Sequence, residues 1–206
     1  MRDVDVGRLY GARDLDELRA EYERIASVYD HVLAGPEDYT SPAAVAAVCG
    51  RLLGLDAWIL DVGAGTGLLG AALVELGFMR LDALDLSTAM LAEAERKGIY
   101  GTLTEGRLGD DLPYETAVYD AVVACGVLTT GHAPASCLDE LVRITRRGGH
   151  VVFTLRSDRT PPGFDEAISG LLQSGAWELA ERGEEFQAMP TSEPEVLVRV
   201  WTFRVS

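Results

Sequence analysis

The sequence predicts an α/β fold, a Rossmann-like three-layer sandwich around a seven-stranded, mostly parallel sheet with a C-terminal antiparallel hairpin. Apolar runs of strand length alternate with segments of helical pattern, as in parallel sheets covered by helices. The strand at residues 58–62 passes through a glycine-rich loop directly into a helix. Residues 177–187 and 195–205 alternate with period two around a turn, which predicts the terminal hairpin.

Length, charge and cysteine content restrict the class of protein. A chain of 206 residues is one domain of ordinary size. It has no apolar run of about 18 residues and no signal peptide, so we expect a cytoplasmic protein without membrane contact. Its three cysteines have no metal-ligand spacing, and we predict no metal. The formal net charge of −15 repels polyphosphate, which argues against nucleic-acid partners.

Two helices are expected before the first strand. Asp14 can cap a helix that runs to about Asp30, and its Tyr22 and Tyr29 are seven residues apart on one face. The pair Ser41-Pro42 is typical of a helix start and predicts a second helix that ends near residue 54.

The glycine-rich loop after the first strand is the feature on which the predicted site depends. A short apolar run ends at Val62, and Gly63, Gly65 and Gly67 then occupy alternate positions before a helix over residues 68–76. Alternate glycines let the backbone turn tightly and approach a ligand, while the helix start offers N–H groups to an anion. We therefore predict a nucleotide- or carboxylate-binding loop at the carboxyl edge of the sheet.

Two glycine patterns overlap here. Gly65, Gly67 and Gly70 match the dinucleotide pattern G-x-G-x-x-G, whose first glycine directly follows the strand. Because the strand ends at Val62, the pattern D-x-G-x-G-x-G beginning at Asp61 fits better. That pattern resembles motif I of the class I S-adenosylmethionine (SAM)-dependent methyltransferases. The resemblance implies that the loop wraps the methionine moiety of SAM, with Asp61 near its ammonium group.

A second acid supports this interpretation. Residues 81–85 form the next expected strand and end at Asp85, about 20 positions past the loop, where a carboxylate suits a ribose diol. Ser87 is expected to cap a helix that ends at Lys97. Asp82 is predicted to be a surface residue.

The loop at residues 105–114 should carry the group that reads adenine, after a weak third strand at residues 99–104. Related methyltransferases usually place an Asp shortly before a Leu-Pro pair. Here Leu108 and Gly109 occupy the places where that acid is expected. A backbone N–H group is the alternative.

Residues 119–125 are the clearest strand after the first, with the continuous apolar character of a central parallel strand. The loop that leaves it contains His132. By resemblance, acceptors meet the methyl group at such loops, so His132 is a candidate general base. A surface histidine without a role is the alternative.

The remaining segments complete the alternation. We expect a helix from residue 134 to the glycine pair at 148–149, a strand at 150–156 and a helix at 164–172. Arg143, Arg146 and Arg147 are predicted to lie at a helix C-terminus, where cations complement the helix dipole.

From about residue 22 on, nearly the whole chain resembles the methyltransferase-like protein family first noted in the Williams–Beuren chromosomal region. The similar segments include residues 59–68, 87–91, 98–100 and 153–156. Residues 22–30 also resemble the N-terminal helix that covers the cofactor in many small-molecule methyltransferases, with Glu23 in place of the usual Asp. The resemblance implies a lid helix and linker in residues 1–40 and a methyltransferase domain in residues 41–206.

The sequence thus predicts a methyltransferase that transfers a methyl group from SAM to an unidentified small molecule. The alternatives are a SAM-binding sensor or interaction protein without methyl transfer, and a nicotinamide dehydrogenase. The predicted cofactor-binding residues are Tyr22, Tyr29, Asp61, Gly63, Ala64, Gly65, Gly67, Asp85, Leu86, Met90, Leu108, Gly109 and Cys125.

Overall fold

The structure, a computed structural model, describes residues 14–32, 38–157 and 160–206. Parts of the predicted lid segment and linker, residues 1–13 and 33–37, therefore lie outside the described residues. The helices are α2 (Leu15–Val32), α3 (Ser41–Leu52), α4 (Leu68–Glu75), α5 (Thr88–Lys97), α6 (Cys137–Ile144) and α7 (Phe164–Gln173). The strands are β1 (Trp58–Val62), β2 (Arg80–Asp85), β3 (Thr102–Glu105), β4 (Tyr119–Ala124), β5 (Thr145–Arg156), β6 (Trp177–Arg182), β7 (Phe186–Met189) and β8 (Glu193–Val205).

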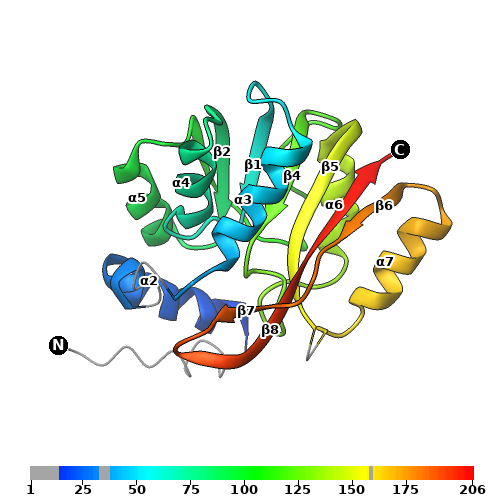
Figure 1. Cartoon of the computed structure of the whole chain (residues 1–206). Coiled ribbons are helices and arrows are strands. Elements are labelled where there is room, and N and C mark those ends of the chain that lie inside the picture. Colours follow the sequence, from blue (N-terminus) through cyan, green and yellow to red (C-terminus); the bar gives the residue numbers. More distant parts are fainter. Residues whose placement is uncertain (1–13, 33–37, 158–159) are drawn as a thin grey trace.

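One sheet runs through the molecule in the order β3-β2-β1-β4-β5-β8-β6, with β7 also pairing with β8 (Figure 1). Strands β1 to β5 are parallel, and β8 is antiparallel to β5, β6 and β7. The predicted fold class is confirmed. The described part of the chain has eight strands rather than seven, because the segment predicted as one strand at 177–187 divides into β6 and β7.

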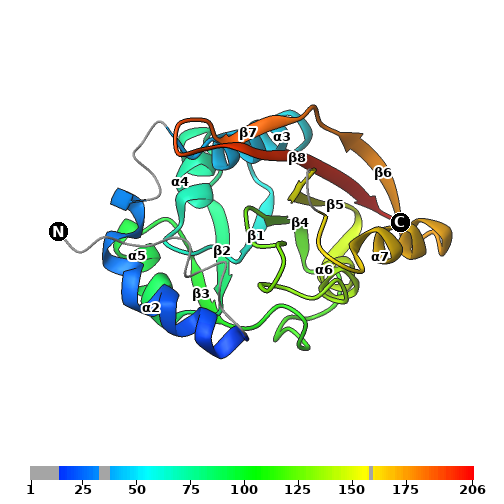
Figure 2. The ribbon, with the colours of Figure 1, turned by 90° about the horizontal axis from the view of Figure 1, so that it is seen from below.

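Helices cover both faces of the sheet (Figure 2). On one face, α3 and α4 pack on a core that includes Ile59, Leu81 and Val123. On the other, α6 and α7 pack on a larger core that includes Leu60 and Phe153. Consecutive residues of β1 thus enter opposite cores, which explains why this strand is apolar without alternation.

Helix α2 lies across the carboxyl ends of the parallel strands rather than on a sheet face (Figure 1). Its cap is the predicted one, since the Asp14 carboxylate accepts a hydrogen bond of 2.9 Å from the Glu17 N–H. Its apolar face packs on α5, with Leu18, Ile25 and Met90 almost fully buried together. None of the helices in the described ranges has the length and apolar character needed to cross a membrane.

The junction between α6 and β5 differs from the prediction. Helix α6 ends at Ile144, and Arg146 and Arg147 belong to β5, so the prediction that they lie at a helix C-terminus is wrong. The chain turns into a strand because Thr145 already pairs with Tyr119 of β4. The guanidinium of Arg146 bonds the Asp120 carboxylate instead.

The prediction of a surface position for Asp82 is also wrong. Asp82 is 5% exposed, and its carboxylate accepts hydrogen bonds from Trp58 Nε1 (2.8 Å), the Thr102 N–H (2.9 Å) and the Tyr119 hydroxyl (3.1 Å). These donors come from strands β1 and β4 and from the first residue of β3. Asp82 therefore joins four strands at a buried polar centre.

Candidate functional site

A deep cleft lies at the carboxyl ends of the parallel strands, beneath α2. Its empty space, including the part open to solvent, is about 890 Å³, within the size range of small-molecule sites. The predicted cofactor-binding residues that line it are Tyr22, Tyr29, Asp61, Gly63, Ala64, Gly65, Asp85, Leu86, Met90, Leu108 and Cys125. Two predicted residues, Gly67 and Gly109, lie outside the lining.

The glycine loop has the backbone that the sequence pattern requires. Gly63, Gly65 and Gly67 all have positive φ angles (68°, 56° and 88°). A Cβ atom on Gly63 would lie 2.5 Å from Cγ2 of Val127, whereas one on Gly65 would have no heavy atom within 4 Å. Gly65 therefore borders open space, as expected where backbone meets a ligand.

The two glycines outside the lining have packing roles. Gly67 is the N-cap of α4, and a Cβ atom there would lie 3.0 Å from the ring of Tyr100. A Cβ atom on Gly109 would lie 2.4 Å from Pro134. Gly67 and Gly109 therefore allow close packing of neighbouring side chains. Neither residue lines the cleft, so the geometry does not support their predicted contact with the cofactor.

Asp61 lies on the floor of the cleft with 1% exposure. Burial and the nearby charge of Asp85 raise the pKa of Asp61 to about 7, and a hydrogen bond acts in the opposite direction. That bond is donated by the Tyr100 hydroxyl to Oδ2 at 2.7 Å. The Tyr100 ring in turn packs against Gly70, where a Cβ atom would lie 2.2 Å from its hydroxyl oxygen. The sequence prediction did not include Tyr100.

Asp85 is the last residue of β2, and its side chain is almost fully buried, with 8% exposure. Its carboxylate accepts hydrogen bonds from the Gly65 N–H (2.7 Å) and the Ser87 N–H (2.9 Å). Burial raises the pKa of Asp85, and the backbone donors oppose that shift. The carboxylate thus holds the glycine loop in place while it faces the cleft.

The electrostatics of the cleft favour a cationic, hydroxyl-bearing ligand. Asp61 and Asp85 are both buried, and within the described chain no cation contributes to the pKa shift of either carboxyl group. Burying two acids without a positive partner is unfavourable unless a ligand supplies positive charge or hydroxyl donors.

Helix α2 is fastened over the cleft at three points. The Tyr22 hydroxyl lies 3.0 Å from Nε2 of His132. The Asp30 carboxylate accepts a hydrogen bond from the Thr66 hydroxyl of the glycine loop and pairs with Lys97 of α5 at 2.7 Å. An ion pair of 2.7 Å also joins Arg19 to Glu105 at the end of β3.

His132 lines the cleft from the loop after β4. Its Nδ1 lies 2.9 Å from the Thr129 hydroxyl and 3.4 Å from the Thr130 carbonyl oxygen. Because a carbonyl oxygen can only accept, this side suits Nδ1–H, which leaves Nε2 as the acceptor that faces Tyr22. Burial lowers the pKa of His132 and so favours the neutral imidazole, the form that a general base needs.

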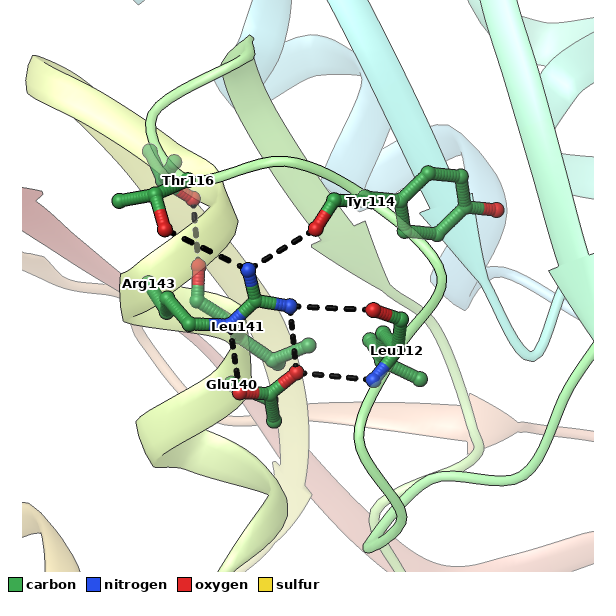
Figure 3. A network of polar contacts seen from close by, with 7 residues as sticks. Leu112, Tyr114, Thr116, Glu140, Leu141 and Arg143 are labelled. Atoms are coloured by element: carbon green, nitrogen blue, oxygen red, sulfur yellow. Dashed lines mark hydrogen bonds and ion pairs between the residues drawn. The ribbon is translucent and has the colours of Figure 1, made fainter.

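The loop between β3 and β4 is held by an ion pair on α6 (Figure 3). Arg143 bonds Glu140 at 2.6 and 2.7 Å and donates to the carbonyl oxygens of Leu112 (3.1 Å) and Tyr114 (2.9 Å). Glu140 accepts from the Leu112 N–H at 2.9 Å. This network fixes the segment that brings Leu108 and the preceding Arg107 to the cleft.

Comparison with known proteins gives the family. A family model described as a methyltransferase domain matches residues 60–153. Methyltransferase-like protein 27 of Homo sapiens is 35% identical over 176 residues, which cover 82% of this chain and 71% of that protein. The chain belongs to the SAM-dependent methyltransferases.

Further similarities agree with this assignment. The demethylmenaquinone methyltransferase of Clavibacter sepedonicus is 30% identical to this methyltransferase over 199 residues, 86% of this chain and 78% of that protein. A putative methyltransferase solved in complex with the Trm112 methyltransferase activator of Haloferax volcanii superposes with a TM-score of 0.70. Its identity is 18%, and the match covers 91% of this chain and 96% of that chain. This last similarity concerns the fold alone.

The residues of the cleft fit SAM, the cofactor of this enzyme family. SAM carries two positively charged groups, a sulfonium and an ammonium, whose charge is complementary to that of the two buried acids. Its ribose diol can donate hydrogen bonds to the Asp85 carboxylate. Gly65 leaves room for a close approach to the backbone. The fit thus rests on two features. The acids near the ends of β1 and β2 supply negative charge, and the glycine loop leaves space for the ligand.

The Asp61–Tyr100 pair predicts how SAM binding depends on pH. A cationic ammonium group needs ionised Asp61, whose pKa is about 7, so affinity should rise as the pH is raised through that value. Tyr100→Phe removes a hydrogen bond that lowers this pKa, and the midpoint should therefore move to higher pH. Calorimetric titration between about pH 5.5 and 8.5 measures both midpoints. Tyr114→Phe, outside the cleft, is the control, and a flat pH profile would contradict the assignment of Asp61.

Proposed function

We propose that this methyltransferase transfers the methyl group of SAM to a small molecule that binds next to His132. The observation that carries the proposal is the contact between Tyr22 and His132, which joins α2 to the loop after β4. The contact lies where the cofactor cleft meets a neighbouring cavity, and it narrows the access to His132 from the α2 side. A narrowed access suits a small acceptor better than a polymer.

The acidity of the chain supports a small acceptor as well. With 33 acidic and 18 basic residues, the protein repels nucleic acid. The relative from Clavibacter sepedonicus is named for a quinone precursor, demethylmenaquinone, which is not a polymer such as RNA or protein. We propose the same broad class of acceptor, a small molecule, for this chain.

In this proposal the protein binds SAM and the acceptor, orients them toward each other and excludes water from the site. SAM supplies a methyl group that its sulfonium already makes electrophilic. Asp85 accepts hydrogen bonds from the ribose hydroxyls and Asp61 faces the ammonium group, while Tyr22 and Tyr29 cover the methionine end. His132 Nε2 accepts the proton of an acceptor hydroxyl, for which it is suited by burial and by the contact of Nδ1 with the Thr130 carbonyl oxygen.

Ligand-dependent thermal stability tests the cofactor assignment. SAM and S-adenosylhomocysteine should raise the melting temperature, and NAD should not. The described residues that line the cleft offer two acids to a cation, and Arg107 is the one arginine or lysine among them that could meet a pyrophosphate. At about a hundredfold excess over its Kd a ligand contributes about 2.7 kcal/mol.

Methyl transfer itself is tested with labelled SAM and a cell extract. We expect label in compounds that pass a small-molecule cut-off filter. Label confined to RNA or protein, with SAM binding intact, would reject the small-molecule acceptor. Equal stabilisation by NAD would reject the cofactor assignment instead.

A further inference from the structure

The edge of the sheet opposite the cofactor cleft carries a group of exposed apolar side chains. They lie around two connections, from α3 to β1 and from α4 to β2, at the amino ends of the parallel strands (Figure 1). The group consists of Leu52, Leu55, Leu76 and Met79, four of the seven large apolar side chains that are exposed in the described part of the chain. Met79 is 75% exposed and Leu55 is 59% exposed. We call these four residues the amino-edge patch.

The four side chains form one surface rather than four separate ones. Leu55 reaches the turn before β2, where a Cβ atom on Gly77 would lie 3.6 Å from its Cδ1. Leu76 reaches α3, where a Cβ atom on Gly50 would lie 3.3 Å from its Cδ1. Single exposed apolar residues are ordinary on a protein surface, but a contiguous group is typical of a contact with another molecule.

Backbone hydrogen bonds hold both connections in place. The Phe78 N–H donates to the Leu73 carbonyl oxygen at 3.2 Å, and the Ala57 N–H donates to the Gly54 carbonyl oxygen at 2.9 Å. The Phe78 side chain is fully buried, while its neighbour Met79 is exposed. The patch is therefore formed before any partner arrives, which keeps the entropy cost of binding low.

The charges beside the patch are balanced, although the chain as a whole has a net charge of −15. Each patch residue has one charged neighbour in the sequence, and these neighbours are Arg51, Asp56, Glu75 and Arg80. We call these four residues the rim. Arg51 pairs with Glu181 at 2.7 Å. Within the described chain the other three rim residues make no ion pair.

Arg80 is held in position without a carboxylate partner. Its guanidinium lies over the Trp58 ring, 5.1 Å from the centroid, and its Nη1 donates to the Asp56 carbonyl oxygen at 3.4 Å. Its charge also reaches Asp120, but that carboxylate is already paired with Arg146. The Arg80 guanidinium can therefore bind a carboxylate of another molecule.

We propose that the amino-edge patch is the interface of a symmetric dimer, in which a second copy of this chain covers it. A two-fold contact sets the same surface on both sides, so the rim can form ion pairs only if it carries both signs of charge. Arg80 of one copy can pair with Asp56 or Glu75 of the other. A strongly basic or strongly acidic partner would leave half of the rim without a counter-charge.

The shape of this edge fits the same occupant. A hollow of about 510 Å³, including the part open to solvent, lies beside the patch. Its lining includes Leu52 of the patch and Asp56 of the rim, together with Leu53 and Ala57. Met79 projects next to it. Each copy thus offers a projecting side chain and a hollow, a combination that a two-fold contact uses twice.

The dimer is independent of the cofactor and of the acceptor. The patch lies at the amino ends of the parallel strands and the cleft at their carboxyl ends, so both clefts of the dimer stay open. Two copies repel each other over most of their surface, because the chain has 33 acidic and 18 basic residues. The balanced rim is a place where a second copy can approach with less repulsion.

Sedimentation velocity of the full chain tests the proposal, at concentrations between about 1 and 500 μM. We expect a monomer–dimer equilibrium within this range, because four apolar side chains and their rim make a small interface. Met79→Asp places a carboxylate in the patch and should raise the dimer Kd at least about tenfold. Leu172→Asp, at an exposed apolar residue of α7, is the matched control and should dimerise like the wild type.

Arg80→Glu tests the rim. It leaves Arg51 as the one basic rim residue and should also raise the dimer Kd at least about tenfold. Arg24→Glu, on α2 at the opposite edge of the sheet, changes the net charge equally and should not. Stabilisation of each variant by SAM to the wild-type extent shows that its fold is intact.

Two outcomes would overturn the inference. A chain that stays monomeric at the highest concentration would show that a second copy does not cover the patch. A dimer that Met79→Asp and Arg80→Glu leave unchanged would place the interface elsewhere. Neither outcome bears on the proposed function, which the thermal shift with SAM and the labelled product test separately.

Discussion

Asp85→Ala is expected to weaken SAM binding on the order of a hundredfold or more. The carboxylate is buried at the end of β2 and faces the cleft, where it can accept both ribose hydroxyls. Each hydrogen bond to a charged acceptor contributes about 1.5–3 kcal/mol. The loss of two such bonds corresponds to about 3 kcal/mol or more, or about two orders of magnitude in Kd.

A second effect acts in the same direction. Asp85 also accepts from the Gly65 N–H at 2.7 Å, so the alanine variant releases the glycine loop from its position next to β2. Asp85→Asn keeps one acceptor oxygen and should lose less affinity. The matched control is Glu75→Ala, at the exposed end of α4 and outside the cleft lining. Calorimetry that finds less than about a threefold loss for Asp85→Ala would reject its role at the ribose.

The cleft-lining residues that the sequence predicted lie in consecutive segments of the chain, where motifs and strand ends can be recognised. A strand end, alternate glycines and an acid at the end of the next strand follow one another along the chain, and Gly63, Gly65 and Asp85 meet at one edge because parallel strands end together. Tyr22 and Tyr29 were found for the same reason, since helical spacing places them on one face of α2.

The residues that were missed reach the site through long-range pairing. Tyr100 precedes β3 and arrives under the glycine loop only because β3 pairs with β2. Val127 fills the space that a Cβ atom on Gly63 would need. Tyr39 is placed by the turn between β7 and β8. No periodicity shows which partners these residues have, because the partners lie far away in the sequence. Residues 98–100 belong to a segment that resembles the family, but that resemblance does not show that Tyr100 bonds Asp61.

The error at Asp82 has a different cause. Alternation along β2 tells which face a residue is on, but not what covers that face. Between β3 and β4 the described chain has no helix, and this part of the sheet is covered by side chains such as Trp58, Tyr114 and Tyr119. Two of these three carry donors that bond Asp82, so a carboxylate is well placed there.

Asp82→Ala should therefore destabilise the fold rather than the cofactor complex. The substitution leaves the Trp58 indole N–H, the Tyr119 hydroxyl and the Thr102 N–H without their acceptor. A donor left unpaired in a buried place costs about 1–3 kcal/mol. We expect the free energy of unfolding to fall by about 3 kcal/mol or more, which is a large part of the stability of a single domain.

Urea unfolding of a short series of variants measures this effect. Tyr119→Phe removes one donor and one bond together, so it should cost about 1 kcal/mol. Asp82→Asn keeps one acceptor oxygen and should fall between the two. At a temperature where Asp82→Ala is still folded, its Kd for SAM should stay within about threefold of the wild type, because Asp82 does not line the cleft. A loss of affinity as large as that of Asp85→Ala, without a loss of stability, would show that Asp82 acts at the site and not in the sheet.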